Sequence, residues 1–179
     1  MKKYKTGVVV GKFLPPQIGH AMLITVAADA CERLFVVLAE RPANTITFCT
    51  QSGLPILPAT LRLEWLKAHF EANKNVHFLY MDESEVPPYP HGTQQWATRL
   101  KGLITRNTAI NTKIDAKFFG EESYFDMMQY FPDTEAVLVK RGMQTPAISA
   151  TQIRSNPTKF FDYLIPPARD YFEKIIKKR

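Results

Sequence analysis

Short apolar runs and longer amphipathic segments alternate along most of the chain, and this alternation restricts the fold more than any other feature of the sequence. Runs rich in β-branched residues, such as Thr6–Val10, are typical of parallel strands that are buried on both faces. Strands are predicted at 6–10, 34–39, 76–81, 117–119 and 136–140, and helices at 17–31, 59–73, 93–107 and 123–131. The pattern therefore predicts an α/β fold: a Rossmann-like, doubly wound parallel sheet of five strands, with helices on both faces and a helical carboxyl-terminal part.

One segment interrupts this alternation. Residues 41–58 are polar and contain the turn-forming residues Pro42, Gly53, Pro55 and Pro58, so they are expected to form a long loop. Loops of that length inside a domain are usually functional or mobile.

The size and composition of the chain indicate a single domain spanning 1–179. A hydrophobic content of 45% with 22% charged residues excludes extended disorder. No apolar run approaches the ~18 residues that a membrane span needs, and the start of the chain leads directly into a predicted strand, so neither a membrane segment nor a signal peptide is expected. Cys31 and Cys49 lack the spacing of a zinc site or a disulfide scaffold, which favours a cytoplasmic protein.

The charge of the chain favours phosphate-bearing ligands. The formal net charge is +6, and part of the excess lies in residues 174–179, which we interpret as a solvated helix end. The sequence has no long basic run and no interleaving of basic and aromatic residues. It therefore gives no support for a nucleic-acid partner.

Residues 11–20 lie between the first predicted strand and the first predicted helix, where a doubly wound sheet binds phosphates. The free N–H groups and the dipole at the start of a helix favour an anion there. Gly11 lets the backbone approach a ligand, and His20 follows Gln17 by three residues, on the same face of the helix. We expect both side chains to point into a phosphate site; the alternative is a polar helix start with an incidental histidine.

A second polar motif occupies residues 148–154. Ser149 and Thr151 can cap a short helix, and Arg154 lies one turn beyond Thr151. Hydroxyl groups, backbone N–H groups and a guanidinium together suit the β- and γ-phosphates of a triphosphate, which arginine can bind with two parallel hydrogen bonds. The alternative is a capped helix with a surface arginine.

The two motifs together resemble the signatures of the nucleotidylyltransferase superfamily, GxFxPxHxGH and ISxTxxR. Gly11, Phe13, Pro15, Gly19 and His20 match the first signature, and residues 148–154 match the second; Gln17 stands where the first signature has a histidine. Glutamine offers only a neutral amide where histidine can carry a charge. This departure therefore predicts an enzyme that is still active but whose rate is lower by roughly ten- to thirtyfold.

Further segments resemble the adenylyltransferase domain of NadR-type nicotinamide mononucleotide adenylyltransferases. They are residues 62–65, residues 89–92 with Trp96 after them, and residues 157–169. The resemblance implies the reaction of ATP with nicotinamide mononucleotide to give NAD and pyrophosphate, with Mg²⁺ bound mainly through substrate phosphates. The kinase and DNA-binding domains of such proteins are not implied, because the chain is short and has no GxxxxGK[ST] motif.

The resemblance also implies roles for individual residues. The catalytic set comprises His20 at the α-phosphate, Arg154 at the β- and γ-phosphates, Gln17, and Lys12 as a further phosphate contact. The substrate-binding set comprises Gly11, Phe13, Gly19, Ser149, Thr151, Trp96 and Tyr89, and no protein metal ligand is expected. Trp96 is a candidate to stack on the nicotinamide ring, although core packing through the helical face that it shares with Leu100 explains it equally well.

Several alternatives remain open at the level of sequence. The chain can be a different nucleotidylyltransferase, such as a pantetheine-phosphate adenylyltransferase or a cytidylyltransferase, or a non-catalytic nucleotide sensor, for which Gln17 is the main support. A synthetase-like RNA-binding fragment is disfavoured, because the chain lacks a KMSKS-type loop. The sequence does not decide between nicotinamide and nicotinate mononucleotide, nor the metal, nor whether the chain forms a homo-oligomer.

Overall fold

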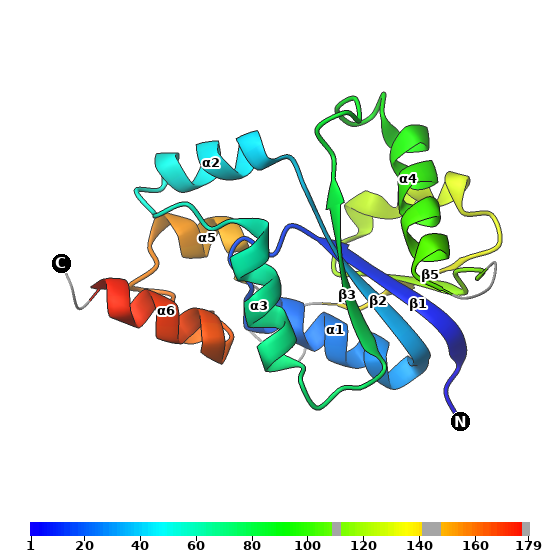
Figure 1. Cartoon of the computed structure of the whole chain (residues 1–179), viewed down its shortest axis with the longest axis horizontal. Coiled ribbons are helices and arrows are strands. Elements are labelled where there is room, and N and C mark those ends of the chain that lie inside the picture. Colours follow the sequence, from blue (N-terminus) through cyan, green and yellow to red (C-terminus); the bar gives the residue numbers. More distant parts are fainter. Residues whose placement is uncertain (109–111, 141–147, 177–179) are drawn as a thin grey trace.

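A five-stranded sheet with all of its strands parallel forms the centre of the molecule, in the order β3-β2-β1-β4-β5 (Figure 1). The computed structural model describes residues 1–108, 112–140 and 148–176. The strands are β1 (Tyr4–Gly11), β2 (Cys31–Glu40), β3 (Val76–Asp82), β4 (Ala116–Phe119) and β5 (Glu135–Leu138). The predicted doubly wound sheet is therefore confirmed, with its strand order reversing between β1 and β4.

Helical segments connect successive strands. They are α1 (Ile18–Ala30), α2 (Pro42–Gln51), α3 (Ala59–His69), α4 (Thr93–Arg106) and the 3-10 helix η1 (Glu122–Tyr130). After β5 follow α5 (Ala150–Ser155), the 3-10 helix η2 (Phe161–Tyr163) and α6 (Pro166–Ile176). The predicted helical carboxyl-terminal part is thus present, and the expected basic end, 174–179, lies partly outside the described residues.

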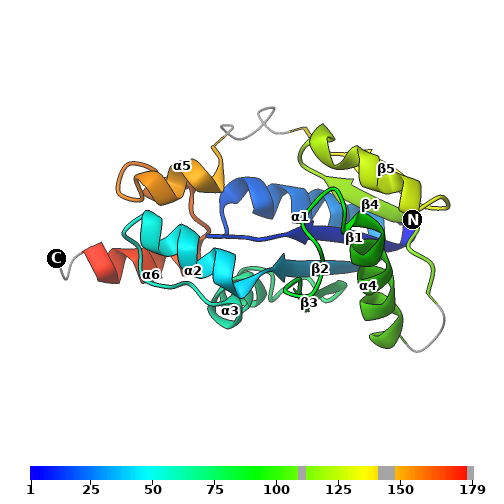
Figure 2. The ribbon, with the colours of Figure 1, turned by 90° about the horizontal axis from the view of Figure 1, so that it is seen from above.

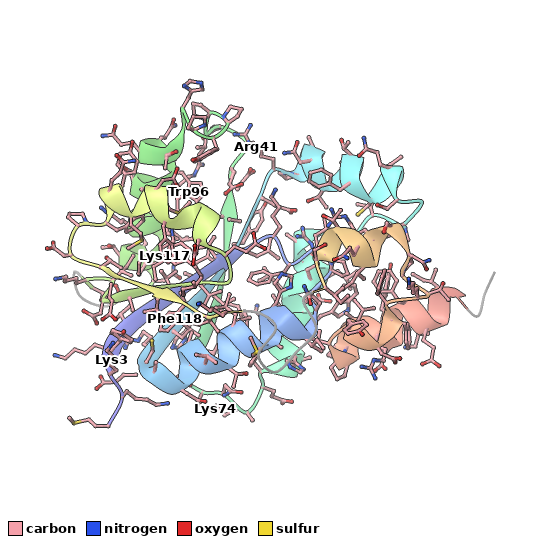
Figure 3. The ribbon with its side chains drawn as sticks, turned by 180° about the vertical axis from the view of Figure 1, so that it is seen from behind. Lys3, Arg41, Lys74, Trp96, Lys117 and Phe118 are labelled. Atoms are coloured by element: carbon pink, nitrogen blue, oxygen red, sulfur yellow. The ribbon has the colours of Figure 1, made fainter. Side chains whose placement is uncertain are left out.

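The two faces of the sheet pack against different helices because successive side chains of a strand point in opposite directions. Val9 and Phe118 belong to the larger apolar cluster, which includes α1, α3 and α6. Val8 belongs to the smaller cluster with α4, on the face that also receives Lys117. Lys117 and Phe118 are neighbours in β4 and diverge toward these two layers (Figure 3).

The expected long loop at 41–58 is half wrong, because its first part is the helix α2. Pro42 lies in the first turn, where its missing N–H costs no hydrogen bond. The sequence pattern did not indicate this helix, because it contains four β-branched residues, which have a reduced helix propensity: Thr45, Ile46, Thr47 and Thr50.

The helices α2, α5 and α6 gather at the end of the sheet toward which β1 runs, remote from the amino terminus (Figures 1 and 2). There Trp65 of α3 packs on Tyr171 and Phe172 of α6, with ring centres 5.1 and 6.4 Å apart, so Trp65 is a core residue. Within the described residues, none of the helices combines the length and the apolar character that crossing a membrane requires.

Candidate active site

A cavity of about 680 Å³ opens beyond the carboxyl ends of β1 and β4, where the strand order reverses. Open α/β sheets bind their ligands at this point, because the loops after neighbouring strands separate there. Of the residues singled out from the sequence, eight line the cavity: Gly11, Lys12, Phe13, His20, Trp96, Ser149, Thr151 and Arg154. Residues 11–20 and 148–154 therefore meet around one space, as their proposed common ligand requires.

The loop after β1 brings Phe13 and His20 together. Phe13 has a φ of 47°, an uncommon conformation for a residue with a side chain, and its ring meets the imidazole of His20 edge to face at 5.1 Å between centres. The Nδ1 atom of His20 accepts a hydrogen bond from the backbone N–H of Gln17 at 3.3 Å. A neutral imidazole held in this way carries its proton on Nε2, which is then its donor atom.

Arg154 connects the second motif to the first. Its Nη1 atom donates to the carbonyl of Leu14 at 2.7 Å, and its Nη2 atom donates to the hydroxyl of Thr151 at 3.1 Å. Burial lowers the pKa of Arg154, but a guanidinium remains protonated in proteins. A positive charge is thus fixed at the wall of the cavity.

The short helix α5 begins at Ser149, whose hydroxyl accepts from the backbone N–H of Gln152 at 3.1 Å, while the Gln152 side chain accepts from the Ser149 N–H. This reciprocal arrangement is a capping box. Of the two expected caps, Ser149 has that role, whereas Thr151 instead orients Arg154. Lys12 and Arg154 lie on the ring of Phe48 in α2, at 5.5 and 5.3 Å from its centre.

A fully buried arginine of α3 holds the loop that follows β1. Arg62 of α3 donates to the carbonyl groups of Leu57 and Lys12 and forms an ion pair with Glu40 at the end of β2. Glu40 also accepts from the hydroxyl of Thr45 in α2. One guanidinium thus binds three separate segments, because its donors point in fixed directions.

Gln17 is not where the sequence led us to expect it. Its side chain is 1% exposed and does not line the cavity. Its Oε1 atom accepts from the N–H of Gly19 at 3.2 Å, and its Nε2 atom donates to the carbonyl of Ile148 at 2.7 Å. Gln17 therefore caps α1 and ties the two motifs together, and the rate loss expected from a neutral amide at the phosphates has no basis in this placement.

Two further residues of the expected substrate-binding set lie outside the cavity. Gly19 is buried in the first turn of α1, where the Gln17 side chain covers it. Tyr89 is 65% exposed, and its hydroxyl donates to the carboxylate of Asp126 on η1, which holds the phenol on the outer surface. The sequence spacing did not show the position of Tyr89, because it depends on a contact with the distant residue Asp126.

Trp96 combines the two interpretations that the sequence left open. It lines the cavity and packs against the apolar cluster of α4, and its indole N–H donates to Glu83 at 2.6 Å. Leu100 and Ile104, which share its helical face, are fully buried.

Lys117 also lies in the cavity wall, which the sequence motifs did not indicate. Its side chain is 2% exposed, and burial lowers its pKa from 10.5 to about 7, although the nearby Asp126 carboxylate acts in the opposite direction. A lysine inside a strand that must be buried on both faces was the available signal. Glu83 and Phe48 also line the cavity and were not in the expected set.

The chemistry of the wall suits a phosphate-bound metal better than a protein-held one. In the described ranges, no three or more His, Cys, Asp or Glu side chains come together as a metal site. Mg²⁺ keeps several waters and binds readily through substrate phosphates, so it fits a cavity with cationic walls only as part of a nucleotide complex.

Comparisons with known proteins agree with this fold. No protein-family model matches the chain. The trifunctional NAD biosynthesis/regulator protein NadR of Escherichia coli (strain K12) is 29% identical over 180 residues, which cover 98% of this chain and 42% of that protein. The chain thus spans less than half the length of this relative.

Two solved structures of NadR proteins superpose on almost the whole chain. A NadR protein in complex with NR has a TM-score of 0.74 at 26% identity and covers 96% of this chain, which matches 46% of that one. A NadR protein in complex with NAD and AMP-PNP has a TM-score of 0.69 at 25% identity, with coverages of 96% and 48%. Over the part that it spans, this chain is therefore homologous to NadR proteins and has the Rossmann-like fold of nucleotidyltransferases.

Proposed function

We propose that the chain transfers the adenylyl group of ATP to nicotinamide mononucleotide, which gives NAD and pyrophosphate. The observation that carries this proposal is the convergence of His20 and Arg154, more than 130 positions apart in the sequence, on one cavity at the switch point of the sheet. The homology to NadR proteins supports the same chemistry.

The reaction needs alignment rather than an activated protein nucleophile. A 5′-phosphate oxygen of the mononucleotide forms a bond to the α-phosphorus of ATP, and the bond from that phosphorus to the bridging oxygen of the β-phosphate breaks. The bridging oxygen takes the electron pair and leaves with pyrophosphate. Because the attacking group is already an anion, catalysis consists of holding both phosphates in line and stabilising the charge that develops.

Three side chains of the cavity suit these tasks. His20 offers the Nε2 proton to an α-phosphate oxygen, since its Nδ1 atom is occupied by the Gln17 N–H. Arg154 offers a fixed charge to the leaving β- and γ-phosphates, and Lys12 offers a more mobile one. Mg²⁺, when bound on the phosphates, neutralises part of their charge.

The first prediction tests these roles directly. The protein is incubated with ATP, Mg²⁺ and nicotinamide mononucleotide, and NAD and pyrophosphate are quantified. We expect His20→Ala and Arg154→Ala each to lower kcat by about 10²-fold or more, because each removes a group that stabilises transferring charge.

The matched controls are His69→Ala on α3 and Arg106→Ala on α4, both exposed and remote from the cavity walls, and both are expected to keep full activity. Absence of pyrophosphate release with the mononucleotide would refute the proposal. Activity with phosphopantetheine instead would indicate a different nucleotidylyltransferase, and nucleotide binding without turnover would indicate a sensor.

A further inference from the structure

Lys117 places a buried amine at the wall of the cavity, next to Trp96 (Figure 3). Its Nζ atom lies 4.5 Å from the centre of the Trp96 ring, 5.1 Å from that of Phe119 and 4.8 Å from that of Phe131. Three aromatic rings from α4, β4 and the end of η1 therefore surround one ammonium group. Aromatic faces attract a cation, but they replace only part of the hydration that burial removes.

The amine has little polar compensation. Across the described parts of the chain, the Lys117 amine donates one hydrogen bond, to the thioether sulfur of Met127, a weak acceptor, and no carboxylate forms an ion pair with it. The nearby carboxylate of Asp126 on η1 accepts the Tyr89 hydroxyl instead. A buried cation without an anionic partner is unfavourable, which is why the pKa of Lys117 falls to about 7.

Other charged groups approach this part of the cavity from several elements. Glu83, after β3, accepts the indole N–H of Trp96, and Glu121, after β4, lines the cavity. Lys101 of α4 lies 4.8 Å from the Phe131 ring centre but is exposed and does not line the cavity. Among the described residues no carboxylate forms an ion pair with Lys117, so an anionic group of a ligand in the cavity would be its first ionic partner.

We propose that Lys117 recognises a ligand carboxylate, and that through it the cavity also accepts nicotinate mononucleotide and favours this acid over the amide. The inference rests on the proposed function, because it requires a pyridine mononucleotide in this cavity with its ring near Trp96. Lys117 and Trp96 form adjoining parts of one cavity wall, so a ring that contacts the edge of Trp96 carries its substituent on the side of the cavity where the amine lies.

Charge decides between the two mononucleotides. The amide form carries a pyridinium cation and a neutral carboxamide, so a protonated Lys117 repels it. The acid form carries the same pyridinium with a carboxylate, which attracts the ammonium group. Both effects are strong in a buried site, where water screens charges poorly.

The test measures the dissociation constants of both mononucleotides by calorimetry, for the wild-type protein, Lys117→Met and Lys101→Met. Lys101→Met is the matched control, because it removes the same charge beside the same Phe131 ring without touching the cavity. We expect the wild type and Lys101→Met to bind the acid at least about tenfold more tightly than the amide, and Lys117→Met to lose this preference.

A second measurement needs no variant. At about pH 8 the free amine of Lys117 is mostly neutral, and a bound carboxylate raises its pKa, so binding of the acid takes up a proton. The uptake appears as a dependence of the binding heat on the ionisation enthalpy of the buffer, and it should be absent for the amide.

Equal preference in the wild type and Lys117→Met, tighter binding of the amide by the wild type, or no proton uptake with the acid would each overturn the inference. In those cases turnover of either mononucleotide would leave the proposed function intact. Failure of the wild type to bind or convert both mononucleotides would instead overturn the proposed function and the inference with it.

Discussion

The burial of Lys117 makes the unfolding free energy of the protein depend on pH. Its pKa is 10.5 when unfolded and about 7 in the folded chain, so the unfolded state binds more protons between these values. The contribution of this residue to the unfolding free energy therefore rises as the pH increases from about 7 to about 10.5.

Replacement of the buried amine should remove this dependence. We expect Lys117→Met to raise the unfolding free energy by about 1–4 kcal/mol at about pH 6. The gain should shrink toward about pH 10, because burial of the neutral wild-type amine is less unfavourable than burial of the ammonium group. Urea unfolding of both proteins across this range checks the prediction. Parallel pH profiles of the two proteins would contradict it.

At the scale of elements, the loop after β1 depends on α3 and on the end of β2. Arg62 is fully buried and joins these segments to the Leu57 carbonyl, and its partner Glu40 is only 3% exposed. Removing one member of such a pair leaves the other as an uncompensated buried charge.

We expect Arg62→Met to lower the unfolding free energy by about 3–5 kcal/mol, and the double change Arg62→Met with Glu40→Gln to recover part of it, because the remaining charge is then removed as well. Denaturant unfolding measures both variants. Because Arg62 also holds the Lys12 carbonyl, NAD formation should fall in either variant. A fully stable Arg62→Met protein would show that the loop has another support.

At the scale of the whole molecule, the cavity is assembled from segments at both ends of the chain. The proposed function places ATP in this cavity, where a ligand contacts only the folded state and stabilises it by mass action. At about one hundred times its dissociation constant the gain is ~2.7 kcal/mol, or roughly 5–10 °C in Tm for a chain of this size.

Thermal unfolding with and without ATP measures this coupling. We expect the shift in the wild type and in Arg106→Ala, and its loss in Arg154→Ala, since Arg154 supplies a fixed cation and joins the second motif to Leu14. An unchanged shift in Arg154→Ala would place ATP elsewhere.

The predictable part of the fold was the part that local sequence controls. The runs of β-branched residues and the helical spacing between them predicted all five parallel strands, although the second begins at Cys31 and not at Leu34, and the helix Thr93–Arg106 nearly to the residue. The helix Pro42–Gln51 was not predicted, because its residues have weak helix propensities. Its helical state depends on the packing of its buried residues, Thr45 and Cys49.

In the site, too, the sequence predicted the local features and the packing decided the rest. By itself the sequence determined which donor and charged groups residues 11–20 and 148–154 carry, because residue type decides which atoms can donate or carry charge, and from these groups it predicted a phosphate site. Only the tertiary structure decided the direction of each side chain: it turned Gln17 into the protein to bind Ile148, held Tyr89 on the surface, and buried Lys117 beside Trp96. The physical reason is that burial and pairing are made by segments far apart in the chain, and no local pattern records which of them will meet.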